Sequence, residues 1–182
     1  MRVIAGIAKG RRLIGPKKGE PIRPVLDQVK EAIFNILYTV DGLRVLDCFA
    51  GTGAVGIEAL SRGAAHATFV DHLPTACAII ERNLAHTGFT DRATTLCMSA
   101  ERAIKTLAAR RAVFDLVFVD PPYEKGFVNT TLAALAETSL LWPNGRIIIE
   151  HHPKEPVDPP AQYALTDRRK YGQTLITFLT CR

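Results

Sequence analysis

Residues 117–126, with the sequence VFVDPPYEKG, combine an apolar run with a carboxylate, two prolines and an aromatic ring. Because proline fixes φ, Pro121 holds its carbonyl rigidly beside the carboxylate of Asp120. Both groups accept hydrogen bonds and can hold an amino group, while Tyr123 offers a face on which a flat heterocycle can stack. With Pro122, these residues form a candidate clamp for an exocyclic amine. A strand that simply ends at two prolines is the alternative.

A glycine-rich loop within residues 45–60, VLDCFAGTGAVGIEAL, supplies a second candidate site. Its glycines, Gly51, Gly53 and Gly56, follow an expected strand and lead into an expected helix, where glycine lets the backbone approach a ligand closely. Asp71 ends the next expected strand, about 20 residues after the first glycine, which is the spacing at which a carboxylate reaches ribose hydroxyls. The combination predicts a nucleoside-containing cofactor. The alternative is that the glycines only permit tight packing of strand and helix.

The kind of cofactor depends on Asp47, which directly precedes the glycine loop. A dinucleotide places its pyrophosphate at the helix N-terminus, where a carboxylate is an unfavourable neighbour. S-adenosylmethionine instead carries an ammonium group, which Asp47 can meet directly or through water. The sequence therefore favours S-adenosylmethionine, with a purely structural Asp47 as the alternative. After the third expected strand, Met98 or Ala100 can flank an adenine ring, although Ser99 as a helix cap and Met98 as a core residue remain equally open.

Alternating strands and helices must position these candidate sites. The apolar patterns predict strands over residues 44–50, 66–71, 93–98, 114–120, 146–152, 162–172 and 174–181, and helices over residues 27–38, 54–63, 74–88, 100–111 and 126–141. Such alternation indicates a mostly parallel sheet with helices on both faces. Because parallel strands place their carboxyl ends together, the glycine loop and Asp120 should share one edge. The last two strands lack a helix between them, which predicts an antiparallel strand at the edge of the sheet.

The bulk composition is that of a soluble, single-domain protein. The chain has 182 residues, of which 47% are hydrophobic and 23% charged. No apolar stretch approaches the roughly 18 residues of a membrane helix, and the basic start lacks the apolar segment of a secretory signal, so we expect a cytoplasmic protein. The adjacent His151 and His152 lack further ligands, so we expect no metal site. The cysteines form no C-x-x-C pair and are expected to be free thiols: Cys48, Cys77, Cys97 and Cys181.

The positive charge is concentrated at the start of the chain. Residues 1–44 contain nine Lys and Arg against four Asp and Glu, whereas the remainder contains fourteen of each. The whole net charge of +5 therefore lies in the first quarter of the sequence. A basic extension on a neutral body predicts a polyanionic partner such as a nucleic acid. A solvated, partly mobile N-terminus without a partner is the alternative.

Several of these motifs resemble a known family. The stretch LDCFAGTGAVGIEALSRGA at 46–64, the acid that ends FVD at 69–71 and the turn FVDPPY at 118–123 are similar to class I S-adenosylmethionine-dependent methyltransferases that modify exocyclic amines. The start MRVIAGIAKGRRL and the segment IRPVLDQVKEAIFNIL at 22–37 are more particular. They extend the resemblance, over nearly the whole chain, to bacterial small-subunit ribosomal RNA guanine-N2 methyltransferases of the RsmD type.

The resemblance implies a fold and an activity. The fold would be the Rossmann-like class I methyltransferase fold, with a mostly parallel seven-stranded sheet, an antiparallel edge strand and a small basic N-terminal extension. Residues 1–40 would form the extension and its helix, and residues 41–182 the catalytic domain. The activity would be methyl transfer from S-adenosylmethionine to the N2 atom of a guanine in 16S ribosomal RNA, guanine 966 in this family. The partner would be ribosomal RNA or the assembling small ribosomal subunit, and the protein a monomer.

The resemblance also implies roles for individual residues. The cofactor would be held by Asp47, Phe49, Ala50, Gly51, Thr52, Gly53, Asp71, His72, Ser99, Ala100 and Asp120. The guanine would be held by Asp120, Pro121, Pro122 and Tyr123, and RNA phosphates by Lys9, Arg11, Arg12 and Arg23. The chain departs from the family pattern at Val25, Leu26 and Gln28, which bears on how RNA or cofactor is held there.

Other functions remain compatible with parts of the sequence. An amino-methyltransferase acting on another RNA, on adenine or cytosine in DNA, or on protein could use the same clamp. A nicotinamide-dependent oxidoreductase could use the glycine loop, but would leave the proline turn without a role. A catalytically idle RNA-binding protein would use only the basic extension.

Overall fold

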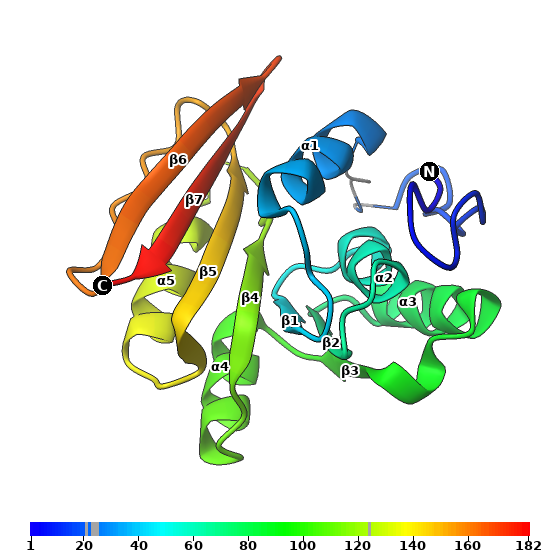
Figure 1. The fold of residues 1–182 in the computed structure, drawn as a ribbon, viewed down its shortest axis with the longest axis horizontal. Helices are drawn as coiled ribbons and strands as arrows, with labels where there is room; N and C mark the ends of the chain where they lie inside the picture. The colour runs from blue at the N-terminus through cyan, green and yellow to red at the C-terminus, as the bar shows by residue number, and fades with distance from the viewer. Residues whose placement is uncertain (21, 23–25, 124) are drawn as a thin grey trace.

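The structure, a computed structural model, describes residues 1–20, 22, 26–123 and 125–182 and is built around one seven-stranded sheet (Figure 1). The strands follow the order β3-β2-β1-β4-β5-β7-β6. They comprise β1 (Arg44–Asp47), β2 (His66–Asp71), β3 (Ala93–Cys97), β4 (Phe114–Val119), β5 (Leu141–His151), β6 (Tyr163–Tyr171) and β7 (Thr174–Cys181). Strands β1 to β5 pair in parallel, and β7 runs antiparallel to both neighbours. The predicted sheet is confirmed, with β7 inserted between β5 and β6.

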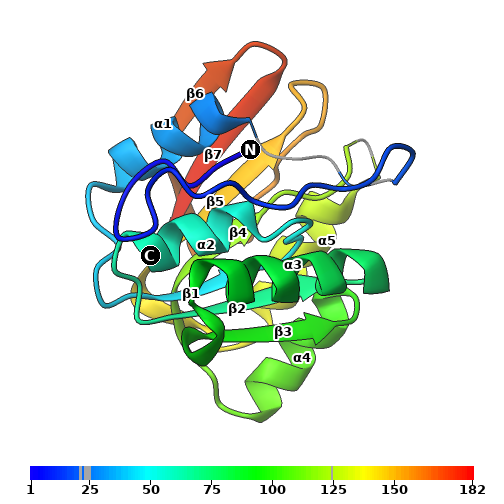
Figure 2. The same cartoon turned by 90° about the vertical axis from the view of Figure 1, so that its right-hand side faces the viewer.

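Helices cover both faces of the sheet, as predicted (Figures 1 and 2). The helical segments are α1 (Asp27–Leu37), α2 (Ala54–Ser61), α3 (Pro74–Thr87), the 3-10 helix η1 (Thr90–Arg92), α4 (Ala100–Ala109) and α5 (Phe127–Ala136). Apolar side chains of α1, α2 and α3 pack with one face of the strands, and those of α4 and α5 with the other. Among the described helices, none combines the length and apolar character needed to cross a membrane.

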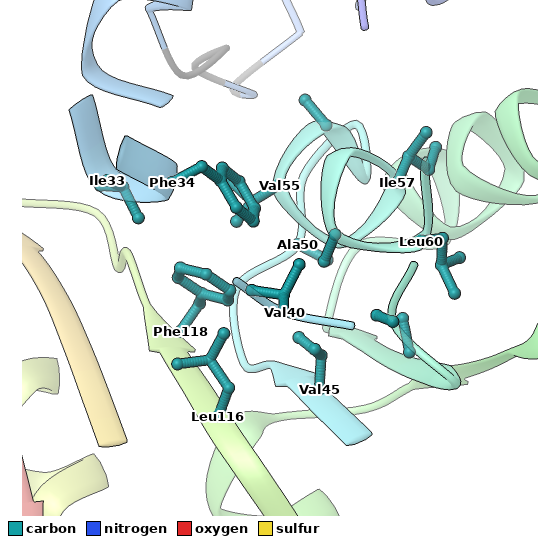
Figure 3. Packing of buried hydrophobic residues seen from close by; sticks show 14 of the residues in the cluster. Ile33, Phe34, Val40, Val45, Ala50, Val55, Ile57, Leu60, Leu116 and Phe118 are labelled. Atoms are coloured by element: carbon teal, nitrogen blue, oxygen red, sulfur yellow. The ribbon is translucent and has the colours of Figure 1, made fainter. Parts of the chain in front are cut away.

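The core beneath α1 and α2 shows why these elements pack closely (Figure 3). Phe34 of α1 lies against Phe118 of β4, with ring centroids 6.0 Å apart and the rings tilted. A Cβ atom on Gly56 of α2 would lie only 2.3 Å from the ring of Phe69 in β2. Glycine at this position therefore lets the helix approach the sheet, as the close-packing interpretation of the glycine motif requires.

Local sequence signals predicted some helix ends correctly and others wrongly. Helix α3 begins at Pro74 and ends before Gly88, which has a left-handed φ of 77°. Helix α5 ends at Ala136 rather than near residue 141. The reason is long-range: Leu140 accepts a 2.7 Å hydrogen bond from the Phe114 amide, and Leu141 pairs with Phe114 in the sheet. Because of these contacts, Leu141, at the end of the expected helix, belongs to β5.

The first fourteen residues, called the N-terminal arm below, are docked on α2 (Figure 2). An isolated antiparallel bridge joins Arg2 to Arg12, and Val3, Ala8 and Leu13 are buried in the same apolar cluster as α1 and α2. These residues therefore form part of the packed body. The packed backbone differs from the partly mobile N-terminus of the alternative, and a partner for its exposed basic side chains stays a prediction. The boundary expected at residues 40 and 41 stays a prediction.

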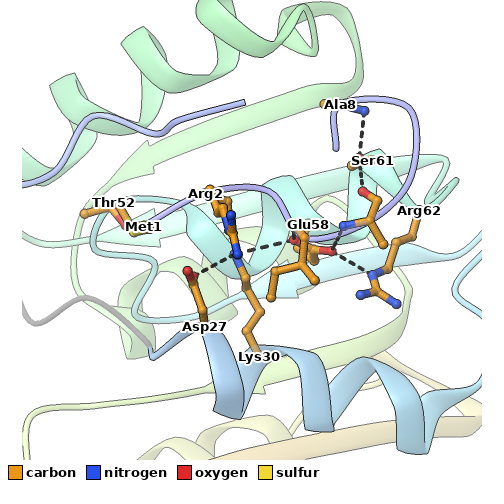
Figure 4. Close-up of polar contacts among 11 residues, drawn as sticks. Met1, Arg2, Ala8, Asp27, Lys30, Thr52, Glu58, Ser61 and Arg62 are labelled. Atoms are coloured by element: carbon orange, nitrogen blue, oxygen red, sulfur yellow. Dashed lines mark hydrogen bonds and ion pairs between the residues drawn. The ribbon is translucent and has the colours of Figure 1, made fainter. Parts of the chain in front are cut away.

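A buried polar network fastens the N-terminal arm (Figure 4). Glu58 of α2 is fully buried and accepts hydrogen bonds of 2.8 and 2.9 Å from the amides of Ile4 and Ala5. Lys30 of α1 lies 3.4 Å from Glu58 and donates a 2.7 Å bond to the Arg2 carbonyl. Burial lowers the pKa of Lys30, and the charge of Glu58 opposes that shift. Arg62 completes the network with a 2.8 Å contact to Glu58.

Candidate functional site

A cleft of about 280 Å³ lies where the carboxyl ends of β1, β2, β4 and β5 meet. It is lined by most residues of the predicted cofactor and amine sites, namely Asp47, Phe49, Ala50, Gly51, Thr52, Asp71, His72, Asp120, Pro121, Pro122 and Tyr123. The glycine loop and the D-P-P-Y turn therefore share one cleft, although they are about 70 residues apart in sequence. The parallel pairing of β1 with both β2 and β4 brings them together.

Three predicted cofactor residues do not line this cleft. Gly53 is at the N-cap of α2, and its amide donates a 2.7 Å bond to Ala50. The Ser99 side chain accepts a 3.4 Å bond from the Arg102 amide and caps α4, which is the alternative role considered for it. Ala100 is the first residue of α4 and is buried in the apolar cluster on that side of the sheet. Their contact with a cofactor stays a prediction.

Asp47 is a buried carboxylate at the end of β1 and lines the cleft. Burial raises its pKa to about 7, against the opposing effect of the Gly56 amide, and the negative charge of Asp71 raises the pKa further. Its Oδ2 atom is buried and, within the described part of the chain, has no hydrogen-bond partner. A buried acceptor beside a cleft suits a ligand that carries a cation. The ammonium group of S-adenosylmethionine fits this requirement.

Asp71 at the end of β2 is fixed by the backbone around it. Its Oδ2 accepts a 2.9 Å bond from the Gly51 amide, and its Oδ1 accepts a 2.9 Å bond from the Leu73 amide. An ionised carboxylate has about four acceptor positions, so these bonds leave capacity for ligand hydroxyls. The Asp71 side chain thus joins the glycine loop to the end of β2 and remains able to bind a ribose.

A further carboxylate lines the cleft and was not predicted. Glu150 at the carboxyl end of β5 is only 7% exposed, and its Oε1 accepts a 3.3 Å hydrogen bond from the Tyr123 hydroxyl. That hydroxyl also lies 3.1 Å from the Thr174 hydroxyl at the start of β7. The sequence carried a signal for it, because Glu150 lies near the carboxyl end of a buried strand, at the same edge of the sheet where Asp120 follows β4.

Apolar residues from outside the sheet also line the cleft and were not predicted. Ile22 packs on Ala76 and Ile79 of α3, and its Cγ2 atom lies 3.4 Å from where a Cβ of Gly51 would be. Ile33 reaches the cleft from α1. The segments before the sheet therefore form part of its wall. The sequence pattern placed Ile33 within an expected helix and gave no sign that it reaches the cleft.

Among the described residues, the predicted RNA-binding side chains are not part of the cleft lining. Lys9, Arg11 and Arg12 are exposed on the N-terminal arm, and Arg11 donates a 2.9 Å bond to the carbonyl of His86. Arg23, also predicted, lies outside the described residues. Of the positions that depart from the family pattern, Val25 also lies outside them, and Leu26 and Gln28 are exposed at the start of α1.

The adjacent histidines have structural contacts. His151 is buried, with its Nε2 atom 2.9 Å from the Thr177 hydroxyl and its Nδ1 atom 3.1 Å from the carbonyls of His152 and Glu155. Burial lowers the pKa of His151. Within the described residues, no three or more His, Cys, Asp or Glu side chains are grouped so that they could hold a metal ion.

Comparison with known proteins identifies the family. The model of the family described as Conserved hypothetical protein 95 matches residues 1–180. Ribosomal RNA small subunit methyltransferase D of Escherichia coli K12 is 34% identical over 176 residues, covering 95% of this chain and 86% of the relative. The protein of the same name from Haemophilus influenzae is 31% identical over 173 residues, covering 94% of this chain and 89% of the relative.

Solved structures agree with the sequence relatives. The protein yhhF of Escherichia coli superposes with a TM-score of 0.86 at 31% identity, covering 100% of this chain and 97% of that one. A hypothetical protein of Thermus thermophilus gives a TM-score of 0.82 at 27% identity, covering 98% of each chain. The strand order is that of class I methyltransferases. The chain therefore belongs to the Conserved hypothetical protein 95 family, which is the RsmD family that its motifs resemble.

Proposed function

We propose that this protein transfers a methyl group from S-adenosylmethionine to the exocyclic N2 atom of a guanine in small-subunit ribosomal RNA. The observation that carries the proposal is the single cleft lined by both Asp47 and the turn from Asp120 to Tyr123. The names of relatives at 31% and 34% identity support ribosomal RNA as the substrate. The resemblance of the motifs supports guanine N2, and guanine 966 as its position.

The cofactor side of the cleft provides two carboxylates with different tasks. S-adenosylmethionine supplies an electrophilic methyl carbon. Asp47 binds the ammonium group, because its buried Oδ2 gains a charged donor and its ionised form is then favoured. Asp71 binds the ribose hydroxyls while the amides of Gly51 and Leu73 keep its orientation.

The substrate side of the cleft holds the amine that reacts. The Asp120 carboxylate and the Pro121 carbonyl accept the two N–H groups of guanine N2 and so turn its lone pair toward the methyl donor. The lone pair is delocalised into the ring of the free base, so this orientation lowers the barrier. Asp120 offsets the positive charge that develops on nitrogen and accepts the proton. Pro122 and the ring of Tyr123 border the base.

The N-terminal arm provides the contact with the RNA backbone. Lys9, Arg11 and Arg12 are exposed on a surface fixed to α2, and such side chains pair with phosphates. Arg23 would join them. The substrate is ribosomal RNA, either free or in the assembling small subunit, and the target base must leave its stack to enter the cleft.

Replacement of Asp120 tests this proposal. We expect Asp120→Asn to lower the single-turnover rate of methyl transfer by at least about 100-fold, because the amide neither carries the charge nor accepts the proton. The affinity for S-adenosylmethionine, measured by calorimetry, should stay close to that of the wild type. Asp115→Asn is the matched control, since Asp115 belongs to β4 and bonds the Arg44 amide at the opposite end of the strand. A near-normal rate for Asp120→Asn would remove that residue from the reaction.

A further inference from the structure

We propose that Glu150 makes the cleft selective for guanine by accepting a hydrogen bond from the N1–H group of the target base. The inference rests on the proposed function, because it concerns the same base in the same cleft. It adds a specificity-determining residue that the sequence motifs did not indicate. Asp120 alone recognises an amine, which adenine and cytosine also carry, so a further group must distinguish the ring to which the amine is attached.

The pairing of β4 with β5 places the two carboxylates side by side. Val119 pairs with Ile149 in parallel register, so the next residues on the two strands are Asp120 and Glu150. Neighbouring strands are about 4.8 Å apart, and both residues line the cleft. The N1–H and N2–H groups of guanine are adjacent on one edge of the base. Two acceptors on neighbouring strands therefore match two adjacent donors.

The carboxylate of Glu150 is held in position. The Tyr123 hydroxyl donates a 3.3 Å bond to its Oε1, and Thr174 lies 3.1 Å from the same hydroxyl. A carboxylate offers about four acceptor positions, so the bond from Tyr123 is compatible with a further hydrogen bond from a ligand. Because Glu150 is only 7% exposed, a hydrogen bond formed there is weakly screened by water. Tyr123 is thus a positioning residue for Glu150 in addition to bordering the base.

Guanine is the base whose chemistry matches this arrangement. Its N1 atom carries a hydrogen next to the amine, whereas the corresponding ring nitrogens of adenine and cytosine are acceptors. A ring acceptor that faces the Glu150 carboxylate opposes two lone pairs, and the Glu150 oxygen that faces the base gains no donor from it. Buried polar groups that lose their partner in this way discriminate strongly between related substrates. Asp120 therefore selects the amine, and Glu150 selects the N–H group beside it.

An oligoribonucleotide that carries either guanine or 2-aminopurine at the methylated position tests the inference. The analogue 2-aminopurine keeps the reacting amine but lacks the N1–H group. We expect the wild type to prefer guanine by about tenfold or more in kcat/KM. Glu150→Gln should reduce that preference severalfold, because an amide can either accept from or donate to the ring nitrogen. Tyr123→Phe keeps the ring and loses the hydroxyl. Its preference for guanine should lie between that of the wild type and that of Glu150→Gln.

The controls separate specificity from folding. Glu155→Gln changes another buried glutamate, which follows β5 and does not line the cleft, and should leave the preference unchanged. Affinity for S-adenosylmethionine should be retained in all variants. If Glu150→Gln and Tyr123→Phe keep the wild-type preference, Glu150 does not read the base. If the wild type forms no N2-methylguanine, the proposed function itself fails. The wild-type protein alone tests that point, whereas the variants test the role of Glu150.

Discussion

Asp47 is the residue whose protonation couples the cleft to pH. Burial raises its pKa in the cofactor-free protein from 3.8 to about 7. Between these values the folded protein retains a proton that the unfolded chain has lost, so this group makes folding less favourable as pH rises from about 4 to about 7. A bound ammonium group favours the ionised form, so cofactor binding below about pH 7 must release a proton.

The affinity for S-adenosylmethionine should therefore rise with pH. We expect an increase of about tenfold between about pH 6 and about pH 8, because binding of the ammonium group requires ionised Asp47. Asp47→Asn should bind more weakly and lose this dependence. Titration calorimetry across this pH range measures the affinity of the wild type and of Asp47→Asn. The same experiment in buffers of different ionisation enthalpy detects the released proton. A wild-type affinity that does not change with pH would contradict this role of Asp47.

At the same scale, the sequence predicted Asp47, Asp71 and Asp120 as cleft residues because each stands where a recognisable strand ends. Glu150 stands in the same relation to β5 but has no neighbouring motif. Whether such an acid faces the cleft depends on strand order and register, which local spacing does not determine. Ser99 caps α4, one of the two roles that the sequence left open, and its contact with a cofactor stays a prediction.

At the scale of elements, the docking of the N-terminal arm on α2 depends on a close backbone contact. Gly6 has a φ of 78°, and a Cβ atom there would lie 1.8 Å from the Ser61 carbonyl oxygen. Ser61 also accepts a 3.0 Å bond from the Ala8 amide and donates a 2.6 Å bond to the Ala5 carbonyl. These contacts leave no room for a side chain between arm and helix.

Two glycines of the arm give a matched pair of substitutions. Gly10 has a φ of 84° with nothing within 4 Å of its Cβ position, so Gly10→Ala should cost only the left-handed strain, about 1 to 2 kcal/mol. Gly6→Ala adds a collision with Ser61 and should detach the arm. Hydrogen exchange should then show lost protection at the Ile4 and Ala5 amides in Gly6→Ala and retained protection in Gly10→Ala. Equal protection of the Ile4 and Ala5 amides in the two variants would contradict the close contact of Gly6 with Ser61.

Element boundaries were predictable where their signals are local. Pro74 and Gly88 mark the ends of α3 through their own backbone preferences. The end of α5 and the start of β5 depend on Phe114, which pairs with Leu141 from 27 residues away. The predicted start of α1 at residue 27 is confirmed, with Leu26 at the N-cap and the Asp27 carboxylate in the first turn, 3.9 Å from Lys30. A contact distant in sequence therefore decided the difference at α5 and β5.

At the scale of the whole molecule, the N-terminal arm and the cofactor loop form one connected structure. Asn83 of α3 is fully buried and accepts a 2.7 Å bond from the Ile14 amide. Its side-chain amide donates to the carbonyls of Ile14, at 3.0 Å, and Thr52, at 2.9 Å. The surface that carries Arg11 and Arg12 is therefore held to the loop that lines the cleft. Alternating sequence patterns predicted the sheet, but not this connection, which three polar contacts create.

The identity of the methylated nucleoside is the most direct test of the account. Unmodified small-subunit ribosomal RNA, free or assembled with its proteins, is incubated with the protein and S-adenosylmethionine, digested to nucleosides and analysed by mass spectrometry against standards. The account predicts N2-methylguanosine from the wild type and almost none from Asp120→Asn. A different methylated nucleoside, or no methylation of either form of the RNA, would contradict it.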